Sequence, residues 1–271
     1  MSCPALPSDD RLSLAEVGAL AAIVVIWGIN NAAAMIATDV LPPLLLAALR
    51  FGMAGLVLVT FLKPPFPEPR SLALLVLLGG PIHFGLIYVG YWLAEDLSPF
   101  VVAFLGVAWM TADPRALRDW IPIVIGLVAA LAWAGCTVLA RRTRGVSPFT
   151  MQGLLAVGTA PVMVLGSLMF ERDQLEAMSR AGPLVWASVV WAGLVSSIVA
   201  TGLLFWLVQR REAGRVTPYL LATPLVSCAI GVGFLGDVLT PQIIVGGLIA
   251  MAGVALVALA ERGLRSGAAS S

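Results

Sequence analysis

The segment SPFVVAFLGVAWM, residues 98–110, decides how many times this chain crosses a membrane. A membrane-spanning helix needs about 20 predominantly apolar residues, and the apolar run that starts at Ser98 ends at Ala112. The run is too short for a crossing and too apolar for a loop. The composition, internal repeats and charge on either side of it explain this shortness.

The composition places the chain in lipid. Hydrophobic residues make up 60% and charged residues 11% of the 271 residues, with a mean hydropathy of +0.98. Soluble domains carry about 25% charged residues. Apolar stretches of spanning length are predicted at 15–37, 41–62, 71–93, 121–140, 148–170, 183–209, 217–236 and 241–260. The sequence therefore predicts an all-α membrane protein.

Charge and cysteine content exclude several other classes. The formal net charge is +1 and the basic residues are scattered, which argues against nucleic acid as a partner. Cys3, Cys136 and Cys228 show no paired spacing for disulfides or zinc, and we expect no cofactor. The polar, acidic opening MSCPALPSDD lacks a basic n-region, so we expect the first helix to be retained.

An internal repeat relates the two halves of the chain. Segment 26–43, IWGINNAAAMIATDVLPP, aligns with 132–149, AWAGCTVLARRTRGVSPF, so that Trp27 falls on Trp133. The two tryptophans lie 106 residues apart, and a proline falls on a proline at the same spacing. Repeats of this kind indicate one structural unit used twice.

The repeat spacing jumps inside the opening segment. SPFVVA at 98–103 matches TPYLLA at 217–222, a spacing of 119, whereas Gly106 matches Gly253, a spacing of 147. The second half thus has 28 residues, 223–250, without a counterpart. We therefore expect helix 4 and the start of helix 5 to be absent between Ala103 and Phe104, by deletion or by omission.

The distribution of Lys and Arg supports ten helices in the full protein. Cytoplasmic loops carry an excess of these residues. With ten helices and the N-terminus inside, eleven Lys and Arg residues lie inside and four lie outside. With nine helices, seven lie inside and eight lie outside. The sequence predicts ten helices and cytoplasmic N- and C-termini.

Two halves of five helices each form an inverted repeat, because an odd number of crossings turns the second copy upside down. The predicted domains are an incomplete first repeat, 1–120, and a second, inverted repeat, 121–271. Inverted repeats are typical of secondary transporters, with the substrate site near the midplane where the repeats meet.

Several motifs resemble the drug/metabolite transporter (DMT) superfamily and its ten-helix EamA-type members. They are Trp27-Gly28 with Asn30, LAALRFGMAG in the second helix, and TPLVSCAIGVGFLGDVLTPQIIVGGLIAMAGVALV at 223–257. Gly236-Asp237 stands where relatives usually have Gly-Glu. The sequence is most similar to YddG-type exporters of aromatic amino acids. The resemblance implies ten helices around a central cavity and outward movement of amphiphilic compounds.

We therefore expect a monomeric transporter in a bacterial-type inner (plasma) membrane that exports aromatic or hydrophobic amino acids by alternating access. Multidrug or cationic-compound efflux is the alternative. No carboxylate lies mid-helix, which favours facilitated diffusion or exchange over ion coupling. An enzyme is disfavoured by the single histidine and the absence of metal-ligand spacing. A purely structural membrane protein is a further alternative.

The third predicted helix offers the first candidate site. His83 lies near its centre, Tyr91 shares its face at helical spacing and Tyr88 lies one position round. This face predicts an aromatic wall with hydrogen-bonding groups for an amphiphilic substrate. The alternative is a histidine that bonds a neighbouring helix without touching substrate.

The first and sixth helices offer a second candidate face. Trp27, Asn30 and Asn31 lie together on one helix, and Trp133 is followed by Thr137 on the other. Tryptophans at equivalent depths are expected to approach a central cavity from both halves. Packing is the alternative for each.

Arg50 lies too deep in the second helix for easy snorkelling. It is a candidate to attract a substrate carboxylate or, structurally, to bond backbone carbonyls where a neighbouring helix is broken. Trp109, Ser196 and Ser197 are weaker candidates for substrate contact, with packing as the alternative.

Overall fold

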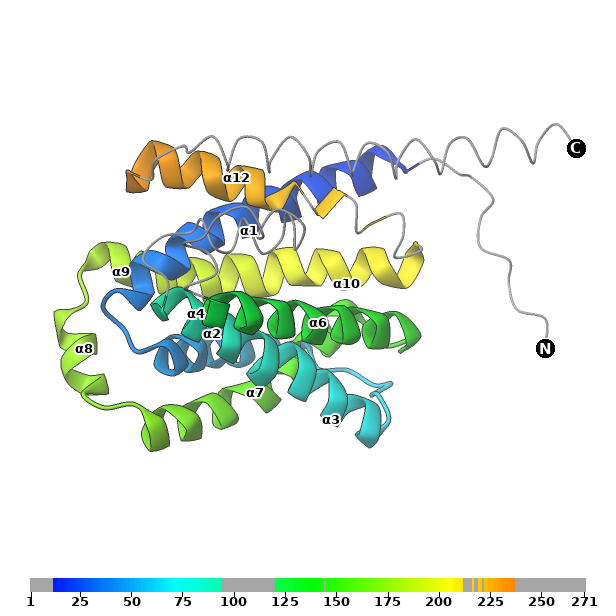
Figure 1. The fold of residues 1–271 in the computed structure, drawn as a ribbon. Coiled ribbons are helices and arrows are strands. Elements are labelled where there is room, and N and C mark those ends of the chain that lie inside the picture. The colour runs from blue at the N-terminus through cyan, green and yellow to red at the C-terminus, as the bar shows by residue number, and fades with distance from the viewer. Residues whose placement is uncertain are drawn as a thin grey trace, which may run out of the picture.

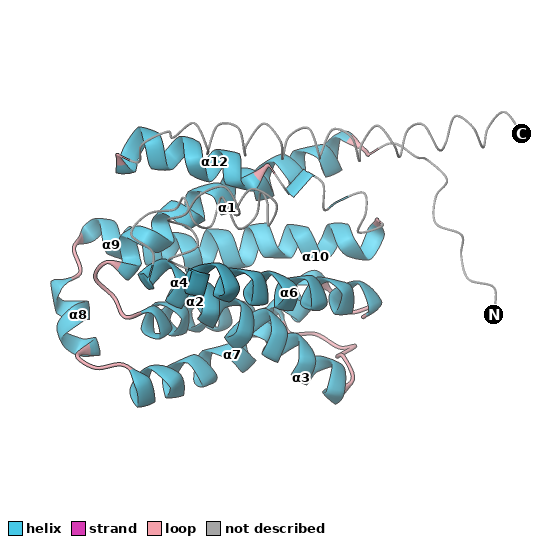
Figure 2. Cartoon of the chain, in the orientation of Figure 1, coloured by secondary structure: helices cyan, strands magenta, loops and turns pink. Residues whose placement is uncertain are grey.

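The computed structural model describes residues 12–93, 120–143, 145–211, 216, 219–220 and 222–236. Within these ranges every regular element is a helix (Figure 2). In chain order they are α1 (Leu14–Thr38), α2 (Pro43–Leu58), the 3-10 turn η1 (Val59–Phe61), α3 (Pro69–Leu77), the π segment η2 (Leu78–Gly85), α4 (Leu86–Leu93), α6 (Trp120–Arg142), α7 (Pro148–Phe170), α8 (Gln174–Arg180), α9 (Pro183–Val190), the π segment η4 (Trp191–Ala200), α10 (Thr201–Arg210), α12 (Thr223–Ile230) and the π segment η5 (Gly231–Leu235).

Six helical segments of the described chain are long and apolar enough to cross a membrane. They are Leu14–Thr38, Pro43–Phe61, Pro69–Val89, Val124–Arg142, Pro148–Phe170 and Pro183–Arg210. They confirm six of the eight predicted stretches. The predicted stretch at 217–236 is described in part, as the shorter apolar helix Thr223–Phe234. The segments 98–112 and 241–260 lie outside the described residues, so the break between Ala103 and Phe104 stays a prediction.

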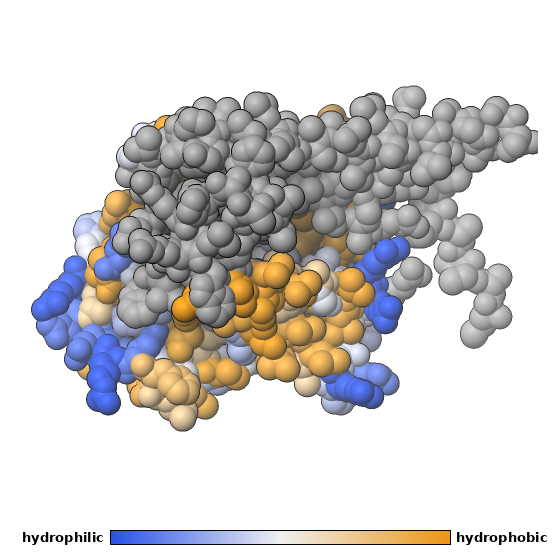
Figure 3. Space-filling view, viewed as in Figure 1, coloured by the Kyte–Doolittle hydropathy of each residue, from blue (hydrophilic) through white to orange (hydrophobic). Residues whose placement is uncertain are grey.

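The outer surface of the bundle suits lipid. Figure 3 shows an apolar band between hydrophilic ends. Leu131, Leu165 and Leu168 expose 65%, 60% and 68% of their surface. A soluble protein rarely leaves such contiguous apolar surface uncovered, so this band is the face that the bilayer covers.

Helix starts follow local sequence signals. Ser13 caps α1 in a capping box, in which its hydroxyl accepts from the Glu16 N–H and the Glu16 carboxylate accepts from the Ser13 N–H. Prolines lie in the first turn of α2, α3, α7, α9 and α12. Proline suits this position because the first helical N–H groups have no intrahelical partner.

The helices α2 and α7 pack against each other in antiparallel fashion. At one end, the Glu171 carboxylate accepts from the backbone N–H groups of Leu44 (2.6 Å) and Leu45 (3.0 Å). At the other end, the Thr150 hydroxyl lies 3.3 Å from the backbone nitrogen of Lys63. Glu171 thus satisfies the exposed donors at the start of α2, where Pro42 offers no side-chain cap.

The remaining helices surround this pair. The helix α1 packs against α9, η4 and α10 on one side and runs beside α12 (Figure 1). Gly28 allows the close approach of α12, because a Cβ there would lie 2.4 Å from the Val226 side chain. In a corresponding way, α6 packs against α3, η2 and α4. Both spans that pack in this way, Pro69–Val89 and Pro183–Arg210, contain a π segment.

Candidate functional site

Three predicted site residues meet at the centre of the described bundle. The rings of His83, on η2, and Trp133, on α6, are stacked with centroids 4.7 Å apart. Trp27, on α1, meets Trp133 edge-on at 5.9 Å. The repeat partners Trp27 and Trp133 therefore contact each other, and their approach to a central cavity stays a prediction.

Further aromatic rings extend this contact into one group, which we call the aromatic cluster. Phe84 lies edge-on to His83 at 4.5 Å and to Trp133 at 5.7 Å. The cluster consists of Trp27, Phe51, His83, Phe84, Tyr88, Trp133 and Phe205. Edge-to-face and offset contacts are the arrangements that aromatic quadrupoles favour, so the rings of the cluster pack on one another in stabilising geometries.

His83 is both packed and hydrogen-bonded. Its Nδ1 lies 2.8 Å from the Ala129 carbonyl oxygen, and because a carbonyl only accepts, Nδ1 carries the proton. This bond ties η2 to α6 beside Trp133. The bond from a neighbouring helix, which was the alternative for His83, is therefore present, and contact of the ring with substrate stays a prediction.

Arg50 lies fully buried in the middle of the Pro43–Phe61 span, with 1% of its surface exposed. Its Nε donates to the Ser197 hydroxyl at 2.7 Å, and its two terminal nitrogens donate to the hydroxyls of Tyr88 (2.8 Å) and Ser196 (3.2 Å). The guanidinium carbon lies 4.1 Å from the Phe84 ring centroid. Arg50 therefore bonds side-chain hydroxyls and an aromatic face, rather than the backbone carbonyls of the structural alternative.

The two serines that hold Arg50 belong to η4. The Ser197 hydroxyl donates to the Ala192 carbonyl at 2.9 Å, and the Thr201 hydroxyl donates to the Ser196 carbonyl at 3.2 Å, each five residues back. These bonds follow the i+5 spacing of a π helix, a local geometry that is frequent at functional sites. Because its hydrogen points to Ala192, the Ser197 oxygen presents lone pairs to Arg50.

The two asparagines of α1 differ in their surroundings. Asn31 donates from Nδ2 to the Ser227 hydroxyl of α12 at 2.8 Å. Asn30 is 7% exposed, and its Oδ1 has no hydrogen-bond partner among the described residues. Asn31 thus joins α1 to α12, whereas Asn30 carries a buried acceptor that is available.

Other predicted residues lie elsewhere. The Thr137 hydroxyl donates to the Trp133 carbonyl of its own helix at 2.8 Å. Tyr91 belongs to α4, but its side chain, like all of Trp109, lies outside what the structure describes. No group of three His, Cys, Asp or Glu residues that suits a metal ion occurs in the described ranges.

Sequence reasoning missed Phe51, Phe84 and Phe205. Phe51 follows Arg50 and Phe84 follows His83 directly, so adjacency to a buried polar residue was the available signal. A phenylalanine in an apolar span has no polar group to distinguish it from a lipid-facing one.

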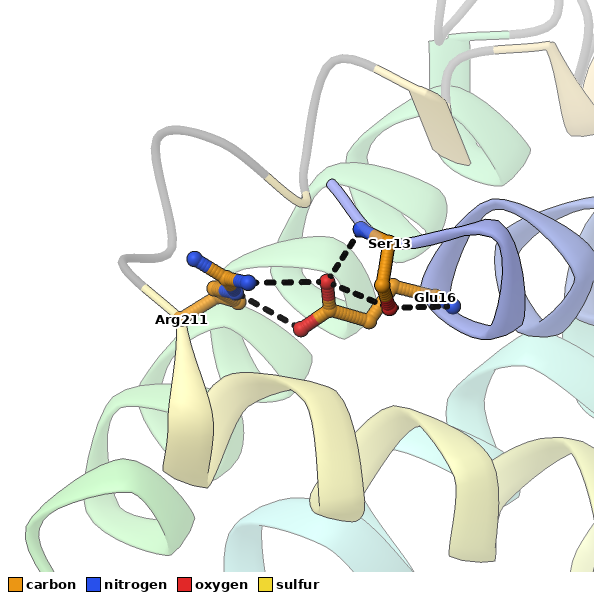
Figure 4. Close-up of polar contacts among 3 residues, drawn as sticks. All are labelled: Ser13, Glu16 and Arg211. Carbon is orange, nitrogen blue, oxygen red and sulfur yellow. Dashed lines mark hydrogen bonds and ion pairs between the residues drawn. The ribbon is translucent and has the colours of Figure 1, made fainter. Parts of the chain in front are cut away.

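A charged contact joins the ends of α1 and α10, away from the aromatic cluster. Arg211 donates from Nε to Glu16 Oε1 at 2.6 Å and from a terminal nitrogen to Oε2 at 3.0 Å (Figure 4). The Glu16 and Arg211 side chains are 7% and 17% exposed. The paired geometry is the one that guanidinium and carboxylate favour, and it closes this end of the α1–α10 contact.

Comparisons with known proteins agree with this architecture. A protein of Salmonella typhimurium named "Probable amino-acid metabolite efflux pump" is 25% identical over 275 residues, which cover 86% of this chain and 91% of that protein. The "Uncharacterized inner membrane transporter YedA" of Escherichia coli strain K12 is 25% identical over 268 residues, which cover 85% and 86%.

A solved crystal structure shares the fold. It superposes with a TM-score of 0.65 at 18% identity and covers 90% of this chain and 97% of its own. The EamA-like transporter family model matches residues 120–259, about half of the chain. The chain is thus a membrane-spanning transporter and not an enzyme. It belongs to the EamA-like transporter family, within the drug/metabolite transporter superfamily.

Proposed function

We propose that this protein exports aromatic and other hydrophobic amino acids across a bacterial inner membrane by alternating access, as a YddG-type carrier. The observation that carries the proposal is the aromatic cluster in the bundle interior, with a buried guanidinium beside it. Aromatic surfaces recognise aromatic side chains through stacked and edge-on contacts. The name of the Salmonella typhimurium relative, an amino-acid metabolite efflux pump, supports the same substrate class.

The buried charge favours amino acids over cationic drugs. Arg50 has no carboxylate partner among the described residues, whose ion pairs are Glu16–Arg211 and Glu176–Arg180. A positive charge in a low-dielectric interior repels a cation strongly. Cationic-compound efflux, the alternative function, needs the opposite local charge.

Ten helices in two inverted repeats, 1–120 and 121–271, form the second part of the proposal. The helix α1 packs on the span Pro183–Arg210 in the way that α6 packs on Pro69–Val89, and α2 lies against α7 between them. Such an exchange of partners is what an inverted repeat produces.

The missing segment also has support. The alignment with the Salmonella typhimurium relative spans 275 positions but includes only 86% of this 271-residue chain, so the chain has gaps opposite that relative. An absent fourth helix between Ala103 and Phe104 gives gaps of this kind. With ten helices, the excess of Lys and Arg places both termini in the cytoplasm.

Uptake of labelled phenylalanine and tryptophan into proteoliposomes tests the function, with empty liposomes as the control. We expect saturable uptake that an imposed pH gradient leaves unchanged, because no carboxylate lies mid-helix to carry a coupled proton. Uptake that follows the gradient contradicts facilitated diffusion, and uptake no greater than in empty liposomes contradicts the substrate class.

A further inference from the structure

We propose that Arg50 recognises the α-carboxylate of the transported amino acid, with the hydroxyls of Ser196 and Ser197 holding its guanidinium in place between transport events. The inference rests on the proposed function, because it names the substrate group that this part of the site selects. It assigns Arg50 a binding role rather than a packing role.

The hydrogen bonds of Arg50 leave two of its N–H donors for a carboxylate. A guanidinium has five N–H donors, and three of them are used by Ser197, Tyr88 and Ser196. The remaining donors lie on the two terminal nitrogens, the pair that binds a carboxylate through two parallel bonds. Arg50 is thus oriented by neutral groups and retains capacity for an anion.

The charge of Arg50 points to an anionic partner. Burying an ionised group is unfavourable unless a counter-charge or a full set of hydrogen bonds compensates. In the described part of the chain, Arg50 contacts three neutral hydroxyls and the Phe84 ring but no acidic group. A substrate carboxylate supplies the missing counter-charge, and exposure of Arg50 during alternating access admits it.

The corresponding position of the other half is packed without a charge. At the repeat spacing of 106, Arg50 corresponds to Ala156, which is fully buried in α7. Near these positions, each helix is approached by a glycine of the other half: Gly193 approaches α2, and Gly79 approaches α7. A Cβ at Gly193 would lie 3.2 Å from the Arg50 carbonyl oxygen, and one at Gly79 would lie 2.8 Å from the Leu155 side chain. The Gly193 contact involves the Arg50 backbone and not its charged side chain, and the corresponding position of α7 is buried as alanine.

Asn30 offers a hydrogen-bond acceptor for the ammonium group of an amino acid. Asn30 lies one helical turn after Trp27, on the face that continues to Ala34, and Ala34 packs in one cluster with Tyr88. The Asn30 Oδ1 is a buried acceptor without a donor in the described ranges. We infer that this oxygen accepts from the substrate ammonium group while Arg50 binds the carboxylate.

Competition with wild-type protein tests the inference without any mutation. Uptake of labelled tryptophan is measured against unlabelled tryptophan, tryptamine, which lacks the carboxylate, and indole-3-propionate, which lacks the ammonium group. We expect tryptamine to compete at least tenfold more weakly than tryptophan, since bonds to charged groups contribute roughly 1.5–3 kcal/mol, or about 10- to 150-fold. Equal competition by tryptamine overturns the carboxylate assignment.

Substitutions at Arg50 test whether this residue causes the preference for tryptophan over tryptamine. We expect Arg50→Gln to raise the KM for tryptophan at least tenfold and to remove the preference over tryptamine, and Arg50→Lys to retain part of both because it keeps the charge. Arg172→Gln, which removes an exposed positive charge after α7, is the matched control and should change neither. If Arg50→Gln transports with an unchanged preference, or lowers kcat alone, Arg50 is structural.

The two proposals fail in different ways. If wild-type protein transports no amino acid, the proposed function is wrong and this inference is wrong with it. If it transports tryptophan and tryptamine equally, export of aromatic compounds stands and only the role of Arg50 is refuted. If Arg50→Gln does not insert, the wild-type competition still decides.

Discussion

The contact between Glu16 and Arg211 provides the sharpest quantitative test of the structure. We predict that the pair stabilises the fold by about 2 kcal/mol, since a partly buried, two-bond ion pair lies between a fully buried one and a surface pair. The perturbation is Glu16→Gln, Arg211→Gln and the double variant. Glutamine at position 16 retains the capping box with Ser13, so the substitution removes the charge while leaving the helix start intact.

A second ion pair in the same chain is the matched control. Glu176 and Arg180 on α8 form an i,i+4 pair whose side chains are 54% and 74% exposed. Such exposed pairs contribute about 0.3–0.5 kcal/mol. The same three glutamine variants are made at Glu176 and Arg180, so one cycle tests a shielded pair between two helices and the other tests an exposed pair within one helix.

The assay is unfolding of purified protein in mild detergent with increasing SDS, followed by circular dichroism. The double-mutant cycle gives the coupling free energy of each pair, free of effects on the separate residues. We expect about 2 kcal/mol for Glu16–Arg211 and less than about 0.5 kcal/mol for Glu176–Arg180. Equal coupling energies would refute the argument that α1 and α10 are held together by a shielded charge pair.

Three further predictions follow from single contacts. Glu171→Ala should lower stability by about 1–2 kcal/mol, because its carboxylate caps α2, and the unfolding assay above measures it. Gly80→Ala should lower the free energy of unfolding by about 1–3 kcal/mol in the same assay, because its Cβ would lie 2.1 Å from the Thr159 hydroxyl oxygen. Gly52→Ala is the control and should leave stability unchanged, because a Cβ at Gly52 meets open space. Equal losses of stability in the two variants contradict this packing. Trp133→Phe should raise the KM for tryptophan about 2- to 12-fold through weaker aromatic contact, and an unchanged KM places Trp133 outside the substrate path.

The helical spans could be predicted from the sequence for a simple reason. In lipid, backbone N–H and C=O groups must bond within the segment, so a long apolar run has few alternatives to a helix. Prolines at the starts of α2, α7 and α9 mark boundaries locally. The equivalence of Trp27 and Trp133 was also accessible from the internal repeat, whereas the contact between their rings came from the structure.

The composition of the candidate site could be predicted from the sequence to a smaller extent than the helical spans. Lipid-facing and interior residues are equally apolar in a membrane protein, so hydropathy could not separate Phe84 of the aromatic cluster from the many other phenylalanines. The partners of Arg50 include Ser197, 147 positions away, and whether a buried arginine meets hydroxyls, carbonyls or acids depends on which helices are adjacent.

The amino-acid sequence by itself thus determined that the chain lies in lipid, where six of its spans begin and end, and which residues are polar inside them. Only the tertiary structure decided how η2 and η4 depart from regular α geometry and bring His83 and Ser197 to their partners. The physical reason is the range of the forces involved. Helix formation in lipid depends on bonds four residues apart, whereas the site depends on packing between helices distant in the chain.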